Sequence, residues 1–134
     1  MLIQNVFING LSSVSAQATF DEEFLTGTVN EPSFEYVGCV EPEYKNFLNP
    51  TASRRFSRII KMSLVAAQRS IAMADNIMPE AIITGTGLGC LEDTEKFLSG
   101  LIVNNESMLS PTAFIQSTHN TLSGQIAMMI KCYH

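Results

Sequence analysis

The chain has 134 residues, 46% of them apolar, which suffices for one domain with a buried core and is too short for two ordinary domains. It holds no run of about 18 consecutive apolar residues and no basic segment ahead of its first apolar stretch, so we expect no membrane span, no signal peptide and a cytoplasmic location. The formal net charge is −5 and the three cysteines form no C-x-x-C pair, so we expect no disulfide framework, no metal site and no bound cofactor.

The first fifty residues predict little regular structure. Residues 2–8 predict a short strand, because three consecutive apolar residues lie between polar positions and a turn at Asn9-Gly10. In residues 12–50, prolines and glycines interrupt short apolar pieces. This part is expected to be loop, with at most one edge strand around residues 34–37.

Residues 51–76 predict a long helix, because their apolar side chains recur three and four positions apart. The stripe consists of Phe56, Ile60, Leu64, Ala67, Ile71 and Ala74. Thr51 or Ser53 is suited to cap the start, because a hydroxyl oxygen accepts a hydrogen bond from the free amides of the first turn. Several alanines on this helix would let another element approach closely, so we expect it to be buried and central.

A strand, a glycine turn and a further helix are predicted after the helix breaker Met78-Pro79. Residues 81–84 are apolar or β-branched and run into the glycine-rich residues 85–89, and residues 92–101 again have helical spacing. The order helix, strand, turn, helix is typical of a layered α/β protein.

The last part of the chain predicts a loop at residues 104–111 and a helix that begins near Ser117 or Asn120. One face of this helix would carry Leu122, Ile126, Met129 and Ile130. The pattern reaches His134 without a cap or a polar tail, and we interpret this as a chain cut in mid-fold.

The pattern Gly-Thr-Gly-Leu-Gly at residues 85–89 raises the question of a phosphate-binding loop. Cys90 stands where the dinucleotide fingerprint requires glycine, and no Lys-Ser/Thr pair completes a P-loop, so nucleotide binding is not expected. Cys90 lies near a helix start, where the dipole can lower a thiol pKa, but we interpret it as a small buried residue. His119 lies in a polar run and is interpreted as a hydrogen-bonding loop residue rather than a catalyst.

Positive charge is concentrated at residues 54–69, where no acidic residue intervenes. This basic island consists of Arg54, Arg55, Arg58, Lys61 and Arg69. On an acidic chain it can attract an anionic partner, and the simpler interpretation is a solvated helix face. Nucleic acid is not expected as the partner, because the net charge is negative and no aromatic residues alternate with the basic ones.

Three segments carry a longer pattern: RRFSRIIKMSLVAAQRSIAMA, AIITGTGLGCLEDTEKFL and LSPTAFIQSTHNTLSGQIAM. In this order they resemble the N-terminal half of the elongating β-ketoacyl synthases. RRFSRIIKMSLVAAQRSIAMA is similar to the family's alanine-rich helix with basic residues at its start, and AIITGTGLGCLEDTEKFL resembles its strand and G-x-G-x-G turn. The last segment resembles the family's S-P-x(8)-N-x(3)-G-[QH]-[IL] stretch through Ser110, Pro111, Asn120, Gly124, Gln125 and Ile126. The resemblance is specific over residues 52–131.

The resemblance implies that residues 1–134 form an incomplete, N-terminal portion of a layered αβαβα fold of the thiolase type. It implies decarboxylative condensation of an acyl group with a malonyl group, both carried on acyl carrier protein. The family's nucleophilic cysteine follows the G-[QH]-[IL] helix, later than Cys132, so no catalytic residue is assigned and we expect this chain alone to be inactive. Two alternatives stay open: a chain-length factor, which keeps the fold without the nucleophile, and a standalone carrier-binding module.

The resemblance also implies site residues. Arg54 and Arg55 coincide with the basic residues that open the family's long helix, and Arg58, one turn beyond Arg54, would share its row. These arginines are expected to dock the acidic carrier protein. Leu88 is expected to border the acyl pocket, with core packing as the alternative. Phe114 lies in the stretch that reaches toward a partner's acyl pocket, which implies a homodimer or a paired heterodimer.

Overall fold

The structure is a computed structural model and describes residues 5–21, 31 and 37–133. Its elements are helical, with no strand in the described ranges. In chain order they are a 3₁₀ turn η1 (Tyr44–Asn46) and the helices α1 (Pro50–Ser53), α2 (Arg58–Met73), α3 (Leu91–Val103), α4 (Pro111–Ser117) and α5 (Thr121–Ile130). None of the described helices has the length and hydropathy needed to cross a bilayer.

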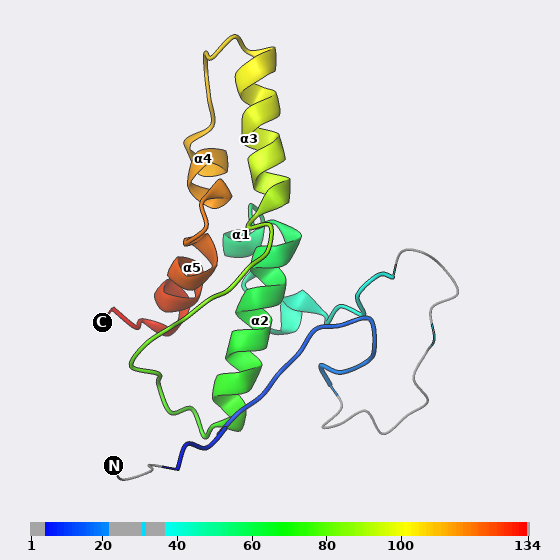
Figure 1. Cartoon of the computed structure of the whole chain (residues 1–134), viewed down its shortest axis with the longest axis vertical. Helices are drawn as coiled ribbons and strands as arrows, with labels where there is room; N and C mark the ends of the chain where they lie inside the picture. Colours follow the sequence, from blue (N-terminus) through cyan, green and yellow to red (C-terminus); the bar gives the residue numbers. More distant parts are fainter. Residues whose placement is uncertain (1–4, 22–30, 32–36, 134) are drawn as a thin grey trace.

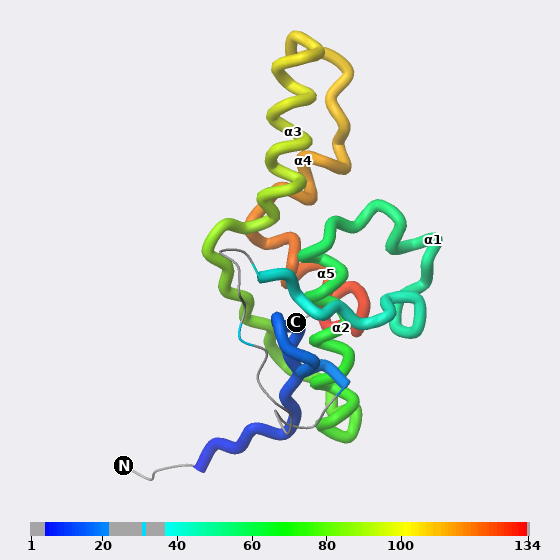
Figure 2. The backbone as a smooth tube through the Cα atoms, turned by 90° about the vertical axis from the view of Figure 1, so that its right-hand side faces the viewer, coloured from blue at the N-terminus to red at the C-terminus, as the bar shows by residue number. Residues whose placement is uncertain are grey.

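Two helix pairs make up the fold (Figure 1). Helix α2 packs against α5 in the body of the molecule, and α3 packs against α4 in an arm that extends away from it. The smooth tube in Figure 2 shows the same arm standing clear of the N-terminal segment, which lies beside α2. The segment that joins α2 to α3 runs back along the body before α3 begins.

The core lies between α2 and α5. Ile60 and Val65 of α2 are fully buried, and they share a cluster with Leu122 and Ile126 of α5. Other members come from the loops and from the start of α3, namely Phe20, Leu48 and Cys90. This burial confirms the predicted buried helix and the apolar face of the last helix. Burial of these side chains is the main favourable contribution to the packing of the two helices.

The predicted helix over residues 51–76 is interrupted, so that prediction is wrong in its continuity. Helix α1 ends at Ser53, and α2 begins after Ser57, which has an extended backbone with ψ 166°. The break lets Phe56 turn inward against the core, which outweighs the helix periodicity of the sequence. The predicted caps are also wrong, because the Asn49 side chain accepts hydrogen bonds from the Thr51 and Ala52 amides at 2.9 and 3.2 Å.

The expected strands are extended segments without ladder hydrogen bonds in the described part of the chain. Residues 5–8 and 81–84 pair with no neighbour there, and Ile83 is 96% exposed. A strand needs a second strand to satisfy its amides and carbonyls, whereas a helix satisfies its own. The layered α/β arrangement is therefore not confirmed by this structure. Parts of both suggested strands lie outside the described residues, namely residues 2–4 of the first expected strand and residues 32–36 around the suggested edge strand. Residue 134 at the chain end also lies outside them.

The later helices follow the prediction with two corrections. Helix α3 covers the predicted residues 92–101, and α5 begins after Asn120, as one of the two suggested starts. Helix α4 is an addition to the predicted elements, although Ser110 caps it and Pro111 opens it, a pair of residues that marks helix starts. Helix α5 does have a cap: Lys131 is left-handed with φ 57°, and its amide donates to the Ala127 carbonyl.

Gly10 marks the closest approach of the N-terminal segment to α2. A Cβ at this position would lie 2.0 Å from the Ser70 carbonyl oxygen and 3.2 Å from the Ala74 amide nitrogen. These are backbone atoms of a packed helix and cannot move aside easily. Only glycine therefore lets the segment lie against α2 at this place.

Candidate functional site

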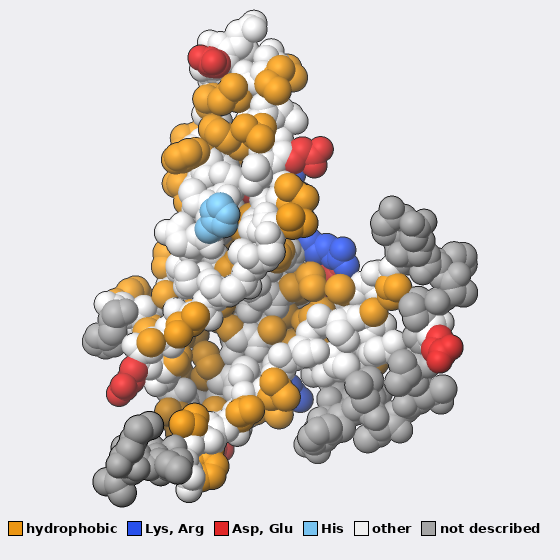
Figure 3. Space-filling view, viewed as in Figure 1, with side chains coloured by type: hydrophobic (Ala, Val, Ile, Leu, Met, Phe, Trp, Pro, Cys, Tyr) orange, Lys and Arg blue, Asp and Glu red, His pale blue; other side chains and the backbone are white. Residues whose placement is uncertain are grey.

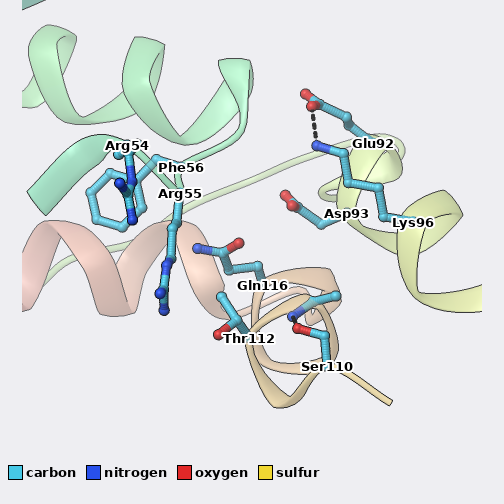
Figure 4. A pocket seen from close by; sticks show the side chains of 10 residues that line it. Arg54, Arg55, Phe56, Glu92, Asp93, Lys96, Ser110, Thr112 and Gln116 are labelled. Atoms are coloured by element: carbon cyan, nitrogen blue, oxygen red, sulfur yellow. Dashed lines mark hydrogen bonds and ion pairs between the residues drawn. The ribbon is translucent and has the colours of Figure 1, made fainter. Parts of the chain in front are cut away.

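A polar cavity of about 600 Å³ lies where the α1–α2 junction faces the start of α3 and helix α4. Its walls contain charged and hydrogen-bonding side chains from all three places, drawn in Figure 4. The lining residues are Arg54, Arg55, Phe56, Glu92, Asp93, Lys96, Ser110, Thr112, Ala113 and Gln116. Segments far apart in the sequence therefore meet at one site.

Arg54 and Arg55 form one wall of this cavity. Both are exposed, and neither makes an ion pair with any residue the structure describes. They lie in the break between α1 and α2, so the chain turns them toward the cavity instead of along a continuous helix. Because of this break, the expected row of Arg54 and Arg58 on one helix face is wrong.

Arg58 has a different environment, because its guanidinium forms an ion pair with the Glu41 carboxylate. The Tyr44 hydroxyl donates a second hydrogen bond to Glu41 at 2.5 Å. The hydrogen bond from Tyr44, with that from Arg58, holds the pKa of the Glu41 carboxyl below its usual value. The pairing of Arg58 with Glu41 cannot be read from the sequence, because seventeen positions separate the two residues.

Glu92 connects the starts of α2 and α3. Its carboxylate accepts from the Lys96 ammonium at 2.5 Å and from the Arg58 backbone amide at 3.3 Å. The hydrogen bond from Lys96 comes first among the causes that lower the pKa of Glu92. A carboxylate near two helix N-termini is also favoured by their dipoles. Lys96 is therefore neutralised by Glu92 at the edge of the cavity.

Asp93 and Gln116 are the most buried of the residues that line the cavity. Asp93 is 3% exposed and Gln116 7%, and the Oδ2 atom of Asp93 has no hydrogen-bond partner among the described residues. Figure 4 shows the Asp93 carboxylate directed into the cavity from the α3 side, with the Gln116 amide between it and Arg55. Neither residue is expected from the sequence, because nothing in a local pattern distinguishes a buried aspartate in the first turn of a helix from a solvated one.

The two expected acyl-pocket residues are both at the surface. Leu88 is 76% exposed, and Phe114 is 54% exposed with its ring 5.4 Å from that of Phe97. A mostly apolar cavity of about 430 Å³ lies elsewhere, between α1, α2 and α5. Leu64, Met128 and Met129 are among its lining residues, and Leu88 and Phe114 are not.

Cys39, Cys90 and Cys132 are free thiols. Cys90 is buried, and its burial, together with the nearby Asp93 carboxylate, raises its pKa, so the thiol is held protonated. The Cys132 thiol donates to the Pro79 carbonyl at 3.3 Å and ties the chain end to the α2–α3 connection. No cluster of three or more potential metal ligands exists in the part of the chain that the structure describes.

The glycine turn packs against His119. Gly89 has φ +62°, and its amide donates to the Thr86 hydroxyl at 3.0 Å. A Cβ at Gly89 would lie 3.7 Å from the imidazole of His119, which is ordinary contact. The constraint on Gly89 is therefore its left-handed backbone rather than space.

The arm carries exposed apolar side chains along both of its helices. We name these residues the arm's apolar face: Leu98, Ile102, Val103, Phe114 and Ile115. Figure 3 shows apolar side chains gathered over the arm. Exposed apolar side chains gathered in one region are typical of a contact surface for another chain or another part of the same protein.

The family model described as beta-ketoacyl synthase, N-terminal domain, matches residues 33–133. No curated protein matches the chain. The matched range includes the cavity, the arm and each of the expected site residues. It confirms the family that the three sequence segments predict.

Proposed function

Because the chain belongs to the β-ketoacyl synthase family through its N-terminal domain, we propose that it is the N-terminal part of a 3-oxoacyl-[acyl carrier protein] synthase. Membership in this family implies a thiolase-like fold. The reaction proposed is the decarboxylative condensation of an acyl and a malonyl group, both delivered on acyl carrier protein. The role proposed for this part is to receive the carrier.

One observation carries this proposal: Arg54 and Arg55 are exposed cations without an ion-pair partner in the described chain, at the mouth of a polar cavity. An unpaired guanidinium can bind a carboxylate through two parallel hydrogen bonds without first breaking another contact. Each exposed pair contributes only about 0.2–1 kcal/mol, but several together raise the rate of encounter and fix the orientation.

Arg58 is proposed as a weaker member of the docking surface. Its guanidinium must leave Glu41 before it can bind a carrier carboxylate, and that exchange offsets most of the gain. Arg54 and Arg55 are therefore expected to dominate the electrostatic attraction.

The condensation itself needs a thiolate that holds the acyl chain and donors that stabilise the developing enolate. Cys90 is a poor candidate, because its thiol is buried and its pKa is raised. Cys132 is engaged with the Pro79 carbonyl. Neither cysteine fits the role, and in the resembling family the nucleophile follows the G-[QH]-[IL] helix, so we propose that it is supplied outside the described residues. An active complete protein would be a synthase, and one that binds carrier without condensing would be a chain-length factor.

Leu88 and Phe114 are proposed to line the acyl pocket once the remaining fold or a partner covers them. Their exposure leaves both side chains available for such a contact. In an active complete protein, Leu88→Phe should shorten the preferred acyl chain, because the larger ring fills pocket volume. Unchanged product lengths would assign Leu88 to packing alone.

The arm's apolar face is proposed as the surface that meets the partner in a homodimer or a paired heterodimer. It includes Phe114, the residue expected near a partner's acyl pocket. Association would bury side chains that water now surrounds, which is the usual source of dimer stability.

A standalone carrier-binding module is the second candidate, and the buried α2–α5 cluster favours it, because the chain has a core of its own. A monodisperse 14.7 kDa species that unfolds cooperatively would support it. Aggregation through the arm's apolar face would instead support a part that requires the rest of its fold.

The docking proposal is tested by replacing Arg54 and Arg55 with glutamate and measuring affinity for an acidic acyl carrier protein at several salt concentrations. We expect the double variant to bind at least about tenfold more weakly and to show a flatter dependence on salt. Arg69→Glu is the control, since it reverses one charge of the same basic island away from the cavity. An equal loss of binding free energy per reversed charge in the two variants would reduce the docking site to net charge.

A further inference from the structure

We infer that the polar cavity is a binding site for a small dipolar molecule, with a cationic or hydrogen-bond-donating group at Asp93 and an acidic group at Arg54 and Arg55. It shares Arg54 and Arg55 with the proposed carrier docking, whereas Asp93 belongs to the cavity site alone. We call Asp93 the floor of the cavity and Arg54 with Arg55 its wall. The floor and the wall carry opposite charges, and neither has an ion-pair partner within the described residues.

The floor supplies the first part of the argument. A buried carboxylate oxygen without a hydrogen bond is costly, and such atoms in folded proteins are normally paired with protein, water or ligand. Asp93 is almost completely buried, its Oδ2 atom has no hydrogen-bond partner in the described chain, and the residue lines the cavity of about 600 Å³. The fold therefore holds a strong acceptor ready for a donor that enters the cavity.

The charges around the cavity decide which donor fits. Glu92 and Lys96 neutralise each other, which leaves Asp93 on the α3 side and the two arginines across from it. A simple cation would be attracted by Asp93 and repelled by the arginines, whereas a simple anion would be attracted by the arginines and repelled by Asp93. A molecule with an ammonium or hydroxyl at one end and a carboxylate or phosphate at the other satisfies both.

The neutral polar side chains support the same orientation. Gln116, itself buried, lies between Asp93 and Arg55 in Figure 4 and can both donate and accept. Ser110 and Thr112 line the opposite side from α4. The site thus has polar groups along the whole path from its acidic floor to its basic wall. A metal ion is a poorer fit, because the described residues hold no cluster of three ligands.

The test uses the full chain and a series of ω-amino acids: glycine, β-alanine, γ-aminobutyrate and ε-aminohexanoate. Calorimetric titration should show that affinity rises to a best length and falls beyond it, because one separation of charges matches the cavity. Propionate and propylamine, which carry one end each, should bind at least about tenfold more weakly than the best member, since each lacks one charge-assisted hydrogen bond.

Asp93→Asn keeps the shape and removes the charge, and it should weaken binding of the best member at least about tenfold. Arg55→Gln should do the same and, being at the surface, serves as the second variant if Asp93→Asn does not fold. Arg69→Gln is the matched control and should bind like the wild type. The inference is overturned if no member of the series binds, if propionate binds as well as the best member, or if Arg55→Gln leaves affinity unchanged. Carrier affinity measured on Asp93→Asn should stay at the wild-type value, so failure here is distinct from failure of the docking proposal.

Discussion

The two helix pairs of this molecule use similar apolar residues in opposite ways. In the α2–α5 pair, Ile60 and Leu122 are buried against each other's helices. In the arm, α3 and α4 pack closely, yet Ile102 and Ile115 remain exposed. The apolar side chains of the arm are therefore not covered within the described chain, and they suit contact with another protein or with another part of this one.

The largest expected effect contrasts one substitution at two places. Ile60→Ala should lower the free energy of unfolding by about 2–5 kcal/mol, because it removes buried methylene groups and leaves a cavity. Ile102→Ala should change it by less than about 0.5 kcal/mol, because that side chain is 73% exposed. Urea denaturation of both variants measures the difference. Similar losses at the two positions would mean that the arm is as tightly packed as the body.

A pair of glycines sharpens the same contrast at the backbone. Gly10→Ala should destabilise the protein by about 1–3 kcal/mol, because the new Cβ would collide with the Ser70 carbonyl. Gly124→Ala, within α5 and with no atom within 4 Å of the new Cβ, should stabilise it by about 0.4–1 kcal/mol. Thermal unfolding of the two variants should therefore shift in opposite directions. A harmless Gly10→Ala would show that the N-terminal segment does not lie against α2 in solution.

The sequence predicts the body of the molecule better than its connections. Helix spacing identifies α2, α3 and α5, because burial of one face is a local, periodic property. The break at Ser57 escapes this pattern, because it depends on where Phe56 packs in three dimensions. The β-branched and apolar runs predict strands, but a strand forms only where another strand is present to pair with it.

The candidate site is predictable only in part. The exposed arginines follow from charge distribution and from resemblance, and two of the three line the cavity. The pairing of Arg58 with Glu41 and the burial of Asp93 cannot be read from the chain, because both arise from contacts between distant segments. The α4 start, in contrast, is readable from Ser110-Pro111.

Self-association is the next test of the contrast. If the arm's apolar face is a contact surface, Ile102→Glu should abolish dimers in sedimentation experiments, because association would bury an unpaired charge, while stability falls by less than about 0.5 kcal/mol. Ile83→Glu is the control, since it places the same charge on an exposed isoleucine outside the arm. A wild-type chain that is strictly monomeric together with a monomeric complete protein would remove the dimer proposal.

The smallest expected effect is electrostatic. The pKa values of Glu41 and Glu92 lie below the usual 4.5, so the stability from their ionised forms is present above that pH and is lost as the pH falls through the lowered values. Glu92→Gln should cost about 0.2–1 kcal/mol at pH 7 and nothing at about pH 2. Glu95→Gln is the control, because Glu95 lies on the same helix without an ion pair in the described chain. It should leave the free energy of unfolding unchanged at pH 7 and at about pH 2. An identical pH profile for wild type and Glu92→Gln would contradict the stabilising contacts of Glu92 with Lys96 and with the Arg58 amide.

Hydrogen exchange of the chain with and without an acidic acyl carrier protein tests the docking proposal and the contrast between the two regions together. We predict that the carrier slows exchange at the α1–α2 junction, around Arg54 to Ser57, and leaves the arm's apolar face and α5 unchanged. Addition of salt should remove this protection. Protection confined to the arm, or absent from the junction at a carrier concentration that saturates binding, would contradict docking at Arg54 and Arg55.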